Sequence, residues 1–286
     1  MTFQNNKKQE HRIKPLEELT LMDGYMFSVV MSNPENMKPL LEYILGVKIS
    51  RIELIESEKT EKEGYESHGI RMDLYVMTDD GQIYDVEVQT SDKANLPKRM
   101  RYYQSVIDIN ILSPGIDYKN LRKSYVLFLC NYDPFGQKRY IYTFENRCLE
   151  DLTLTFGDET VKIIVNTKGS TGEISEELKE LIDYLDKGLV GGAYTKQLDD
   201  AVKSVRSSEK RRREYMIAKI HEMEIREEGR EEGRKEGREE GREEGVDQSR
   251  IDSIKSLMNT LKLTAQQAME ALSIPLSEQS RYLTKL

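Results

Sequence analysis

The sequence has few of the residues that build disulfide frameworks and zinc sites. Its 286 residues contain two cysteines and three histidines. Cys130 and Cys148 form no C-x-x-C pair and the histidines show no ligand spacing, so we expect reduced thiols and surface histidines. The longest apolar run, Val126 to Cys130, is too short to cross a bilayer. The polar N-terminus lacks the apolar core of a signal peptide. We therefore expect a cytoplasmic protein with no membrane partner.

The composition sets limits on the fold and on the partners. Charged residues make up 33% of the chain and apolar residues 37%, which predicts one good-sized core with a heavily charged surface. The formal net charge of −8 argues against a protein that coats nucleic acid without specificity. DNA binding through local basic clusters stays open. The sequence shows no serine, tyrosine or three-acid arrangement of a recombinase.

Two alternating segments, 71–77 and 83–89, predict a β-hairpin. Apolar residues alternate with polar ones in both, which is typical of strands with one buried and one solvent-facing side. The loop between them, Asp79-Asp80-Gly81, has the glycine that a three-residue hairpin loop favours. Pairing must also keep the two apolar sides together, and this requirement fixes the register.

The register places several acidic residues on one face of the hairpin. Asp73 faces Glu87, and Tyr75 faces Asp85. Like charges that face each other across strands destabilise a sheet, so the arrangement predicts a cation among Asp73, Asp85 and Glu87. The residues alone leave a second interpretation open, in which the three acids are the solvated side of an amphipathic hairpin.

The surrounding patterns predict a mixed α/β sheet. A nearly continuous apolar run at 124–130 is typical of a central strand buried on both faces. Pro34 and Pro97 are each expected at the start of a helix, and Gly46 is expected to end the helix that begins at Pro34. The other expected elements are helices at 19–31, 34–45 and 97–112 and strands at 49–55, 139–145 and 161–165.

After residue 170 the patterns predict helices alone, at 175–186 and 195–225. Between 227 and 245 a four-residue repeat places glycine at every fourth position, with arginine after it and mostly glutamate between. Each glycine costs a helix about 1 kcal/mol relative to alanine, whereas a charged pair contributes a few tenths. The repeat is therefore either a flexible charged linker or a helix stabilised by a partner along its glycine row.

Several runs, in this order and spacing, resemble one known family. The resemblance covers residues 18–190 and the repeat, and the family is that of the PD-(D/E)XK nuclease family transposases, also called recombination-promoting nucleases. Beside the repeat, the runs are Leu21-Met22-Asp23-Gly24-Tyr25-Met26-Phe27, Gly69-Ile70-Arg71-Met72-Asp73, Val86-Glu87-Val88-Gln89-Thr90, Leu96-Pro97-Lys98-Arg99-Met100-Arg101-Tyr102-Tyr103-Gln104 and Tyr140-Ile141-Tyr142-Thr143-Phe144-Glu145-Asn146-Arg147-Cys148.

The resemblance implies a fold and an activity. The fold is a restriction-endonuclease-like mixed sheet with an αβββαβ core, here followed by a C-terminal helical tail. The activity is magnesium-dependent DNA cleavage in a bacterial cell, with a link to recombination. By position, Asp73 and Glu87 are the motif acids and Gln104 is a polar residue near the site. Gln89 stands where the wider superfamily has lysine, and a neutral amide cannot supply that positive charge.

The residues that the resemblance marks have chemistry suited to phosphodiester hydrolysis. Magnesium takes oxygen ligands, so Asp73, Glu87 and the Val88 carbonyl are expected to hold Mg²⁺, with Mn²⁺ as a substitute. The ion would polarise the phosphate and lower the pKa of a bound water, which Gln89 would orient. Lys98, Arg99 and Arg101 are expected to hold the DNA backbone, although a solvated helix face is the simpler explanation of such a cluster.

We therefore predict a cytoplasmic, metal-dependent DNA endonuclease that forms a homodimer or larger assembly through its C-terminal helical region. The alternative is a catalytically degenerate protein that binds DNA or acts as a scaffold. The expected divisions of the chain are a flexible arm at 1–17, a nuclease-like core at 18–170, a helical extension at 171–225, the charged repeat at 226–246 and a small helical segment at 247–286.

Overall fold

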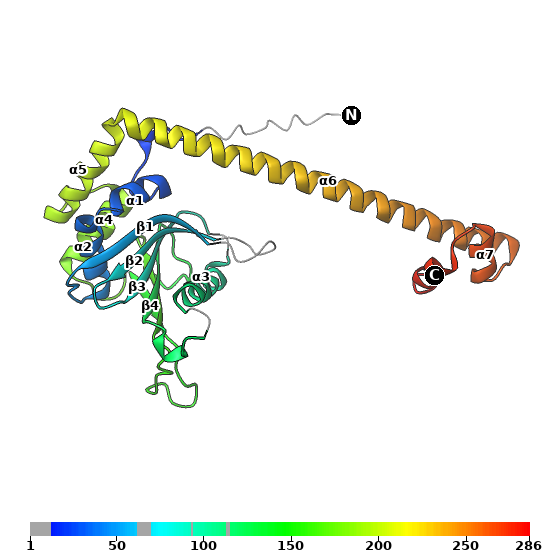
Figure 1. The fold of residues 1–286 in the computed structure, drawn as a ribbon, viewed down its shortest axis with the longest axis horizontal. Coiled ribbons are helices and arrows are strands. Elements are labelled where there is room, and N and C mark those ends of the chain that lie inside the picture. Colours follow the sequence, from blue (N-terminus) through cyan, green and yellow to red (C-terminus); the bar gives the residue numbers. More distant parts are fainter. Residues whose placement is uncertain (1–12, 62–69, 93, 113–114) are drawn as a thin grey trace. The chain divides into compact units, whose positions relative to one another are not determined.

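The computed structural model describes residues 13–61, 70–92, 94–112 and 115–286, so most of the expected arm lies outside the described residues. Within them the chain forms a six-stranded sheet of order β1-β2-β3-β4-β6-β5 (Figure 1). Its first three strands are antiparallel, β3, β4 and β6 are parallel, and β5 is antiparallel at the edge. The strands are β1 Ile52–Glu61, β2 Ile70–Thr78, β3 Ile83–Gln89, β4 Ser124–Cys130, β5 Ile141–Phe144 and β6 Thr160–Asn166.

The predicted hairpin and its register are confirmed. Leu74 pairs with Val86, and Tyr75 with Asp85. The Thr78 N–H donates to the Gln82 carbonyl at 3.1 Å and closes the three-residue loop. Gly81 has φ +81°, in the left-handed region where glycine carries no Cβ penalty. Turn length and side-chain alternation are both local, which explains why the sequence determines this part of the sheet.

Both faces of the sheet are buried, and the expectation of a solvent-facing side is wrong. Helix α3, Leu96–Ile111, covers the face that carries Tyr75, Ile83, Val126 and Phe128. The opposite face packs against four helices and contains the larger core. Those helices are α1 Gly24–Met31, α2 Pro34–Leu45, α4 Glu176–Lys187 and α5 Ala193–Ser207.

The helix boundaries follow their capping residues. Asn33 caps α2 by accepting from the Glu35 N–H at 3.1 Å, and Gly46 ends that helix with φ 68°. The first helix begins at Gly24 and not at residue 19, because the chain before it makes a turn in which Asp23 accepts from the Thr20 N–H. The single helix expected at 195–225 is interrupted by extended backbone at Ser208.

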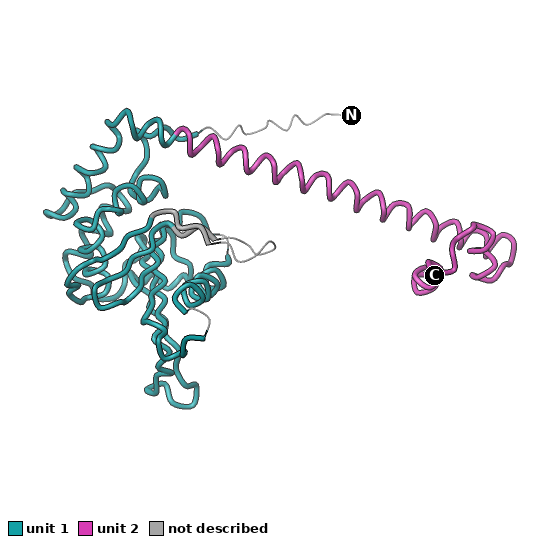
Figure 2. Tube along the Cα trace, viewed as in Figure 1, with its two compact units in different colours: residues 1–215 teal, residues 216–286 magenta. Residues whose placement is uncertain are grey.

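The chain divides into two compact units, residues 1–215 and residues 216–286 (Figure 2). The glycine repeat is helical and lies within α6, Glu209–Leu261. At the end of α6, Ile251 and Ile254 pack with Met269 and Tyr282 in a small separate core. Two short helices, α7 Ala265–Ala271 and α8 Leu276–Leu283, complete this core. No helix among the described residues is long and apolar enough to span a membrane.

Candidate active site

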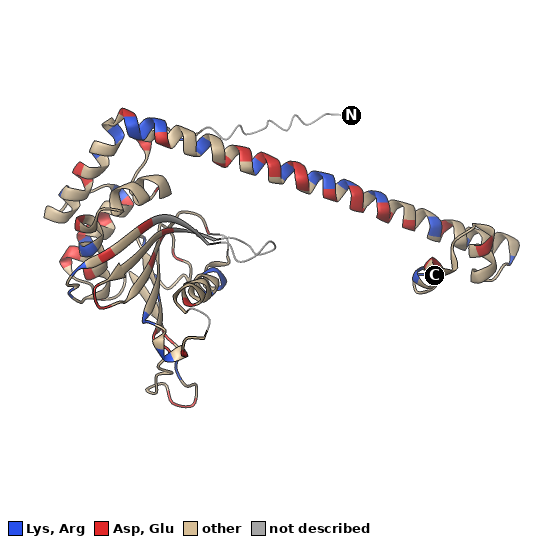
Figure 3. Cartoon of the chain, in the orientation of Figure 1, with Lys and Arg blue, Asp and Glu red and all other residues tan. Residues whose placement is uncertain are grey.

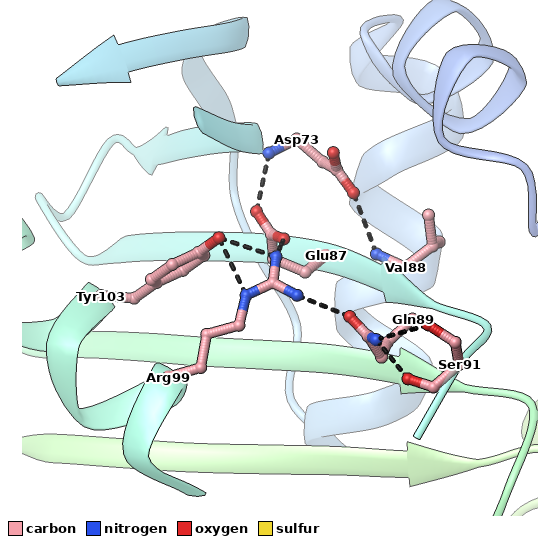
Figure 4. A network of polar contacts seen from close by, with 7 residues as sticks. All are labelled: Asp73, Glu87, Val88, Gln89, Ser91, Arg99 and Tyr103. Carbon is pink, nitrogen blue, oxygen red and sulfur yellow. Dashed lines mark hydrogen bonds and ion pairs between the residues drawn. The ribbon is translucent and has the colours of Figure 1, made fainter. Parts of the chain in front are cut away.

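The two motif acids meet where the β2–β3 ladder ends. Beyond the Leu74–Val86 pair, side chains replace the backbone partners: the Asp73 N–H donates to Glu87 Oε1 at 2.7 Å, and the Val88 N–H donates to Asp73 Oδ2 at 3.1 Å (Figure 4). The N–H and C=O of one strand residue point the same way, so the Val88 carbonyl also faces Asp73. The end of the ladder, where these bonds join Asp73, Glu87 and Val88, is thus an opening in the backbone pairing of the two strands.

The start of α1 also borders this opening. A Cβ built on Gly24, the first residue of α1, would lie 4.0 Å from Asp73 Oδ1. Asp73 is thus placed between the end of the hairpin ladder and the beginning of a helix. Gly24 belongs to one of the runs on which the family resemblance rests.

Glu87 is almost fully buried and is paired with an arginine. Its side chain is 1% exposed, and Oε2 accepts from Arg99 Nη2 at 2.8 Å. Arg99 lies in the first turn of α3, over the same face of the sheet. Burial and the neighbouring Asp73 carboxylate raise the pKa of Glu87 to about 8, even beside Arg99. The 2.8 Å contact with Arg99 favours the ionised form of Glu87 and opposes this rise.

Arg99 is held by partners on three sides. Nη1 donates to Gln89 Oε1 at 2.6 Å, while Nε and Nη2 donate to the Tyr103 hydroxyl at 3.0 and 2.7 Å. The guanidinium carbon lies 5.0 Å from the centre of the Tyr103 ring and 5.1 Å from that of Phe128. Such contacts with aromatic faces stabilise a cation, so the guanidinium has a defined position at the site.

Asp85 is a third acid on the same face, beside Glu87. It is fully buried, and neither carboxylate oxygen accepts a hydrogen bond within the part of the chain that the structure describes. Burial first, and the Glu87 carboxylate second, raise the pKa of Asp85 well above its usual range. No three His, Cys, Asp or Glu side chains of the described residues form a group that could hold a metal ion. The expected cation among all three acids is therefore not supported.

The comparison with protein families finds one match. The family model of the PD-(D/E)XK nuclease family transposases matches residues 21–159. This part of the chain belongs to that family. The matched segment contains the whole hairpin, α3 and the opening between Asp73 and Glu87. No curated protein and no solved structure matches the chain.

The nuclease-family domain has the restriction-endonuclease-like α/β architecture that the sequence predicts. Members of this superfamily typically use divalent metal ions, and oxygen donors suit such ions. The donor set of Asp73, Glu87 and the Val88 carbonyl fits a single hard cation in chemistry. Arg99 already donates to Glu87 Oε2, however, and its positive charge would oppose an ion at that carboxylate.

The other predicted site residues differ in their exposure and in their distance from the two motif acids. Lys98 and Arg101 are exposed, whereas Arg99 turns inward to the acids. Gln89 accepts from Arg99 and donates to the Ser91 carbonyl at 2.5 Å, so its oxygen is occupied. Gln104 lies farther along α3 and is buried.

Gln104 contacts polar residues away from the two motif acids. Its Nε2 donates to Ser124 Oγ at 2.6 Å and to Asp108 Oδ1 at 3.3 Å, while its Oε1 has no partner among the described residues. These bonds join α3 to the first residue of β4. They give Gln104 a clear role in holding the helix on the sheet.

Sequence reasoning missed the inward position of Arg99 and the role of Tyr103. A signal was present, because Leu96, Met100, Tyr103 and Ile107 form a buried stripe at helical spacing. Arg99 is one position from Met100 and four from Tyr103, at the border of that stripe. Its neighbours Lys98 and Arg101 point to the other side of the helix.

Proposed function

We propose that the chain is a divalent-metal-dependent DNA endonuclease whose site is formed by Asp73, Glu87 and the Val88 carbonyl. The observation that supports this proposal is that two hydrogen bonds join Asp73, Glu87 and Val88 at the end of the β2–β3 ladder, inside the segment that matches the nuclease family. Mg²⁺, with Mn²⁺ as a substitute, would polarise the scissile phosphate and lower the pKa of a bound water. Its product, a cut DNA strand, is a starting point for recombination.

The residues of the chain would divide the work as follows. Asp73 and Glu87 bind the ion, and the buried position of Glu87 keeps bulk water from its oxygens. Lys98 and Arg101, on the exposed side of α3, contact DNA phosphates, which position the duplex without reading its sequence. Gln89 accepts a hydrogen bond from Arg99, and Gln104 donates one to Ser124. Both bonds support the geometry of the site.

A plasmid assay tests this proposal. The full chain is incubated with supercoiled DNA and Mg²⁺ or Mn²⁺, beside Asp73→Asn and Glu87→Gln, which preserve side-chain shape. We expect nicking by the wild type, loss of nicking in both variants and loss with a chelator. Asp117→Asn, an exposed aspartate outside the site, is the matched control and should cut like the wild type. Equal nicking in all four proteins would exclude a site at Asp73 and Glu87.

One observation favours a second candidate function, DNA binding or scaffolding without cleavage. Arg99 already neutralises Glu87, and a neutral glutamine stands at the position that carries lysine in the wider superfamily. The same assay separates the two functions when DNA binding is measured in parallel. Binding that is equal in the wild type, Asp73→Asn and Glu87→Gln, with no nicking under any metal, would establish the scaffold.

We also propose that α6 pairs with α6 of a second copy. Its exposed side carries unpartnered apolar residues, with Met216 42%, Ile220 50% and Met223 52% exposed. These three lie at helical spacing on one face. Farther along, no atom lies within 4 Å of a Cβ built on any glycine of the repeat, so the glycine row is open. Small residues in a row let two helix backbones approach closely.

The charges beside the glycine row favour a parallel pair. Successive helix residues are turned by 100°, so the glutamate before each glycine and the arginine after the first four of them lie on opposite flanks of the row. Figure 3 shows basic and acidic residues alternating along this part of α6. In a parallel pair, opposite flanks of the two helices meet, as e and g positions do in coiled coils. Arginine of one copy then faces glutamate of the other, whereas an antiparallel pair brings like charges together.

A further inference from the structure

Glu87 has no free oxygen in this structure. Oε1 accepts from the Asp73 N–H at 2.7 Å, and Oε2 accepts from Arg99 Nη2 at 2.8 Å (Figure 4). The first bond belongs to the hairpin and is compatible with an ion, because a carboxylate oxygen has more than one lone pair. The second bond brings a full positive charge to the oxygen that an ion would use. A guanidinium and a divalent ion would repel each other there.

Gln89 is turned to the arginine and not toward the opening. Its Oε1 accepts from Arg99 Nη1 at 2.6 Å, and its Nε2 is fixed by the Ser91 carbonyl at 2.5 Å. Because the amide nitrogen is anchored, the oxygen has a defined direction. Gln89 is therefore a positioning residue for the guanidinium. While Arg99 is in place, the Gln89 oxygen is directed to the guanidinium and does not orient a water molecule as expected.

Arg99 can leave Glu87 and still remain at the site. Its bonds to Gln89 and to the Tyr103 hydroxyl involve other N–H groups, and the Tyr103 and Phe128 rings support the guanidinium from the side. The Arg99 side chain is 31% exposed, against 1% for Glu87. The arginine can therefore move toward solvent, whereas the glutamate cannot follow it.

From these contacts we propose that Arg99 is a built-in counter-cation that competes with the divalent ion for Glu87. Without metal, the guanidinium neutralises the buried carboxylate. When an ion binds at Asp73 and Glu87, Arg99 gives up Glu87 and stays beside the ion on Gln89 and Tyr103, where it can contact a substrate phosphate. Arg99 thereby supplies the positive charge that Gln89 lacks. The proposal rests on the metal site of the proposed function.

Direct measurement of Mn²⁺ binding to the full chain, without DNA, tests this competition. Binding is followed by calorimetry and by the electron paramagnetic resonance signal of free Mn²⁺. Removal of the competitor in Arg99→Gln should tighten binding by about tenfold or more, since the ion no longer has to break a buried charge pair. Arg99→Lys keeps the charge but loses the planar fork that joins Glu87 to Gln89. We therefore expect its Mn²⁺ affinity to lie between those of the wild type and Arg99→Gln.

Matched variants separate competition from a general change in charge. Arg122→Gln removes the same charge near Gly81, at the other end of the hairpin, and should leave the affinity within about twofold of the wild type. Asp73→Asn should abolish binding in both the wild-type and Arg99→Gln backgrounds. Circular dichroism and urea unfolding confirm that each variant is folded.

Each result has a distinct meaning. The competition is supported if Arg99→Gln binds Mn²⁺ more tightly than the wild type and Asp73→Asn abolishes this binding. The same holds if the wild type binds Mn²⁺ too weakly to measure. Unchanged or weaker binding in a folded Arg99→Gln overturns the competition and leaves the metal site intact. Binding that does not depend on Asp73, or no binding in either protein, overturns the metal site of the proposed function and the competition with it.

Discussion

The Asp73 N–H donates to Glu87 Oε1 across the end of the β2–β3 ladder, at 2.7 Å. A motif acid thus replaces the backbone carbonyl that a continuous ladder would supply. The hydrogen bond connects the two acids through the main chain of one and the side chain of the other. Their separation is therefore set by the sheet itself, and changes at Glu87 must affect both the fold and the site.

Removal of the Glu87 carboxylate should destabilise the domain. Glu87→Ala leaves the Asp73 N–H and Arg99 without their partner, and breaking a buried charge pair costs about 3–5 kcal/mol. Because Arg99 is 31% exposed and water can solvate it in part, we expect a loss of about 2 kcal/mol. Glu87→Gln retains an acceptor for Asp73 and should lose less. Urea unfolding measures both, and equal stability of the two variants would contradict this account.

Asp85 should make the stability fall as the pH rises. Its pKa is raised in the folded chain by burial and by Glu87. Above about pH 4, the usual pKa of an aspartate, the unfolded chain has lost a proton that the folded chain keeps, so folding weakens with increasing pH. Asp85→Asn removes this titration. The free energy of unfolding of Asp85→Asn, minus that of the wild type, should therefore be about 1–3 kcal/mol higher at pH 8 than at pH 5.

Urea unfolding at the two pH values provides the measurement for Asp85. Glu87 also has a raised pKa, about 8, so Asp85→Asn should reduce the pH dependence without abolishing it. Asp117→Asn is the control, since asparagine can still accept from the Lys119 N–H that Asp117 binds at 2.9 Å. An identical pH dependence in the wild type and Asp85→Asn would show that Asp85 keeps its charge in the folded chain.

The Tyr103 hydroxyl should contribute to both stability and the position of Arg99. It accepts from Nε at 3.0 Å and from Nη2 at 2.7 Å. Tyr103→Phe removes this acceptor, and we expect a loss of about 1 kcal/mol in unfolding free energy and a changed Mn²⁺ affinity, because the hydroxyl holds Arg99 both beside Glu87 and after its withdrawal. The neighbouring Tyr102, which is 40% exposed, provides the matched control as Tyr102→Phe. If Tyr103→Phe and Tyr102→Phe bind Mn²⁺ equally well, the Tyr103 hydroxyl does not help to position Arg99.

Alanine in the glycine row should stabilise the helix and weaken the pair. No atom lies within 4 Å of a Cβ built on Gly233 or Gly237, so each alanine adds about 1 kcal/mol to a single helix. Where two copies approach along the row, the added methyl groups separate the backbones. We expect Gly233→Ala/Gly237→Ala to lower the mass measured by light scattering while the helix content is kept. Glu231→Ala/Glu239→Ala serves as the control, because each of these residues lies two positions before a glycine and therefore on the far side of the helix from the row.

The mass of the glycine variant decides the role of the row. An unchanged mass, in a protein whose wild type self-associates, would assign the association to another surface. A wild type that remains monomeric at all concentrations would exclude the pairing of α6 altogether.

The sequence predicts the hairpin of this domain well because its information is local. Asp79-Asp80-Gly81 sets the loop, and the alternation of Leu74 and Val76 sets the face, so Asp85 is placed opposite Tyr75 without knowledge of the rest of the chain. The order of helices and strands follows from similar local patterns. Register and element order were therefore within reach of sequence reasoning.

The burial of the acidic face and the position of Arg99 depend on distant residues. Alternation shows which side chains share a face, but it does not show that α3 covers that face. Tyr75 and Ile83, both apolar, were a sign that the polar side of the hairpin is not solvated. The link from Arg99 to Glu87 requires the β3–α3–β4 crossover to close, and helical spacing alone does not specify how α3 is placed on the sheet.

The crossover also has a consequence for synthesis. β4 pairs with β3 and β6 in parallel, and such non-local pairing forms slowly compared with a hairpin. During translation, the strands that carry Asp73 and Glu87 leave the ribosome before α3 and β4 exist to cover them. A nascent chain interrupted before residue 130 would lack the strand against which β3 is fixed, so the contact of Arg99 with Glu87 would form only after the domain is complete.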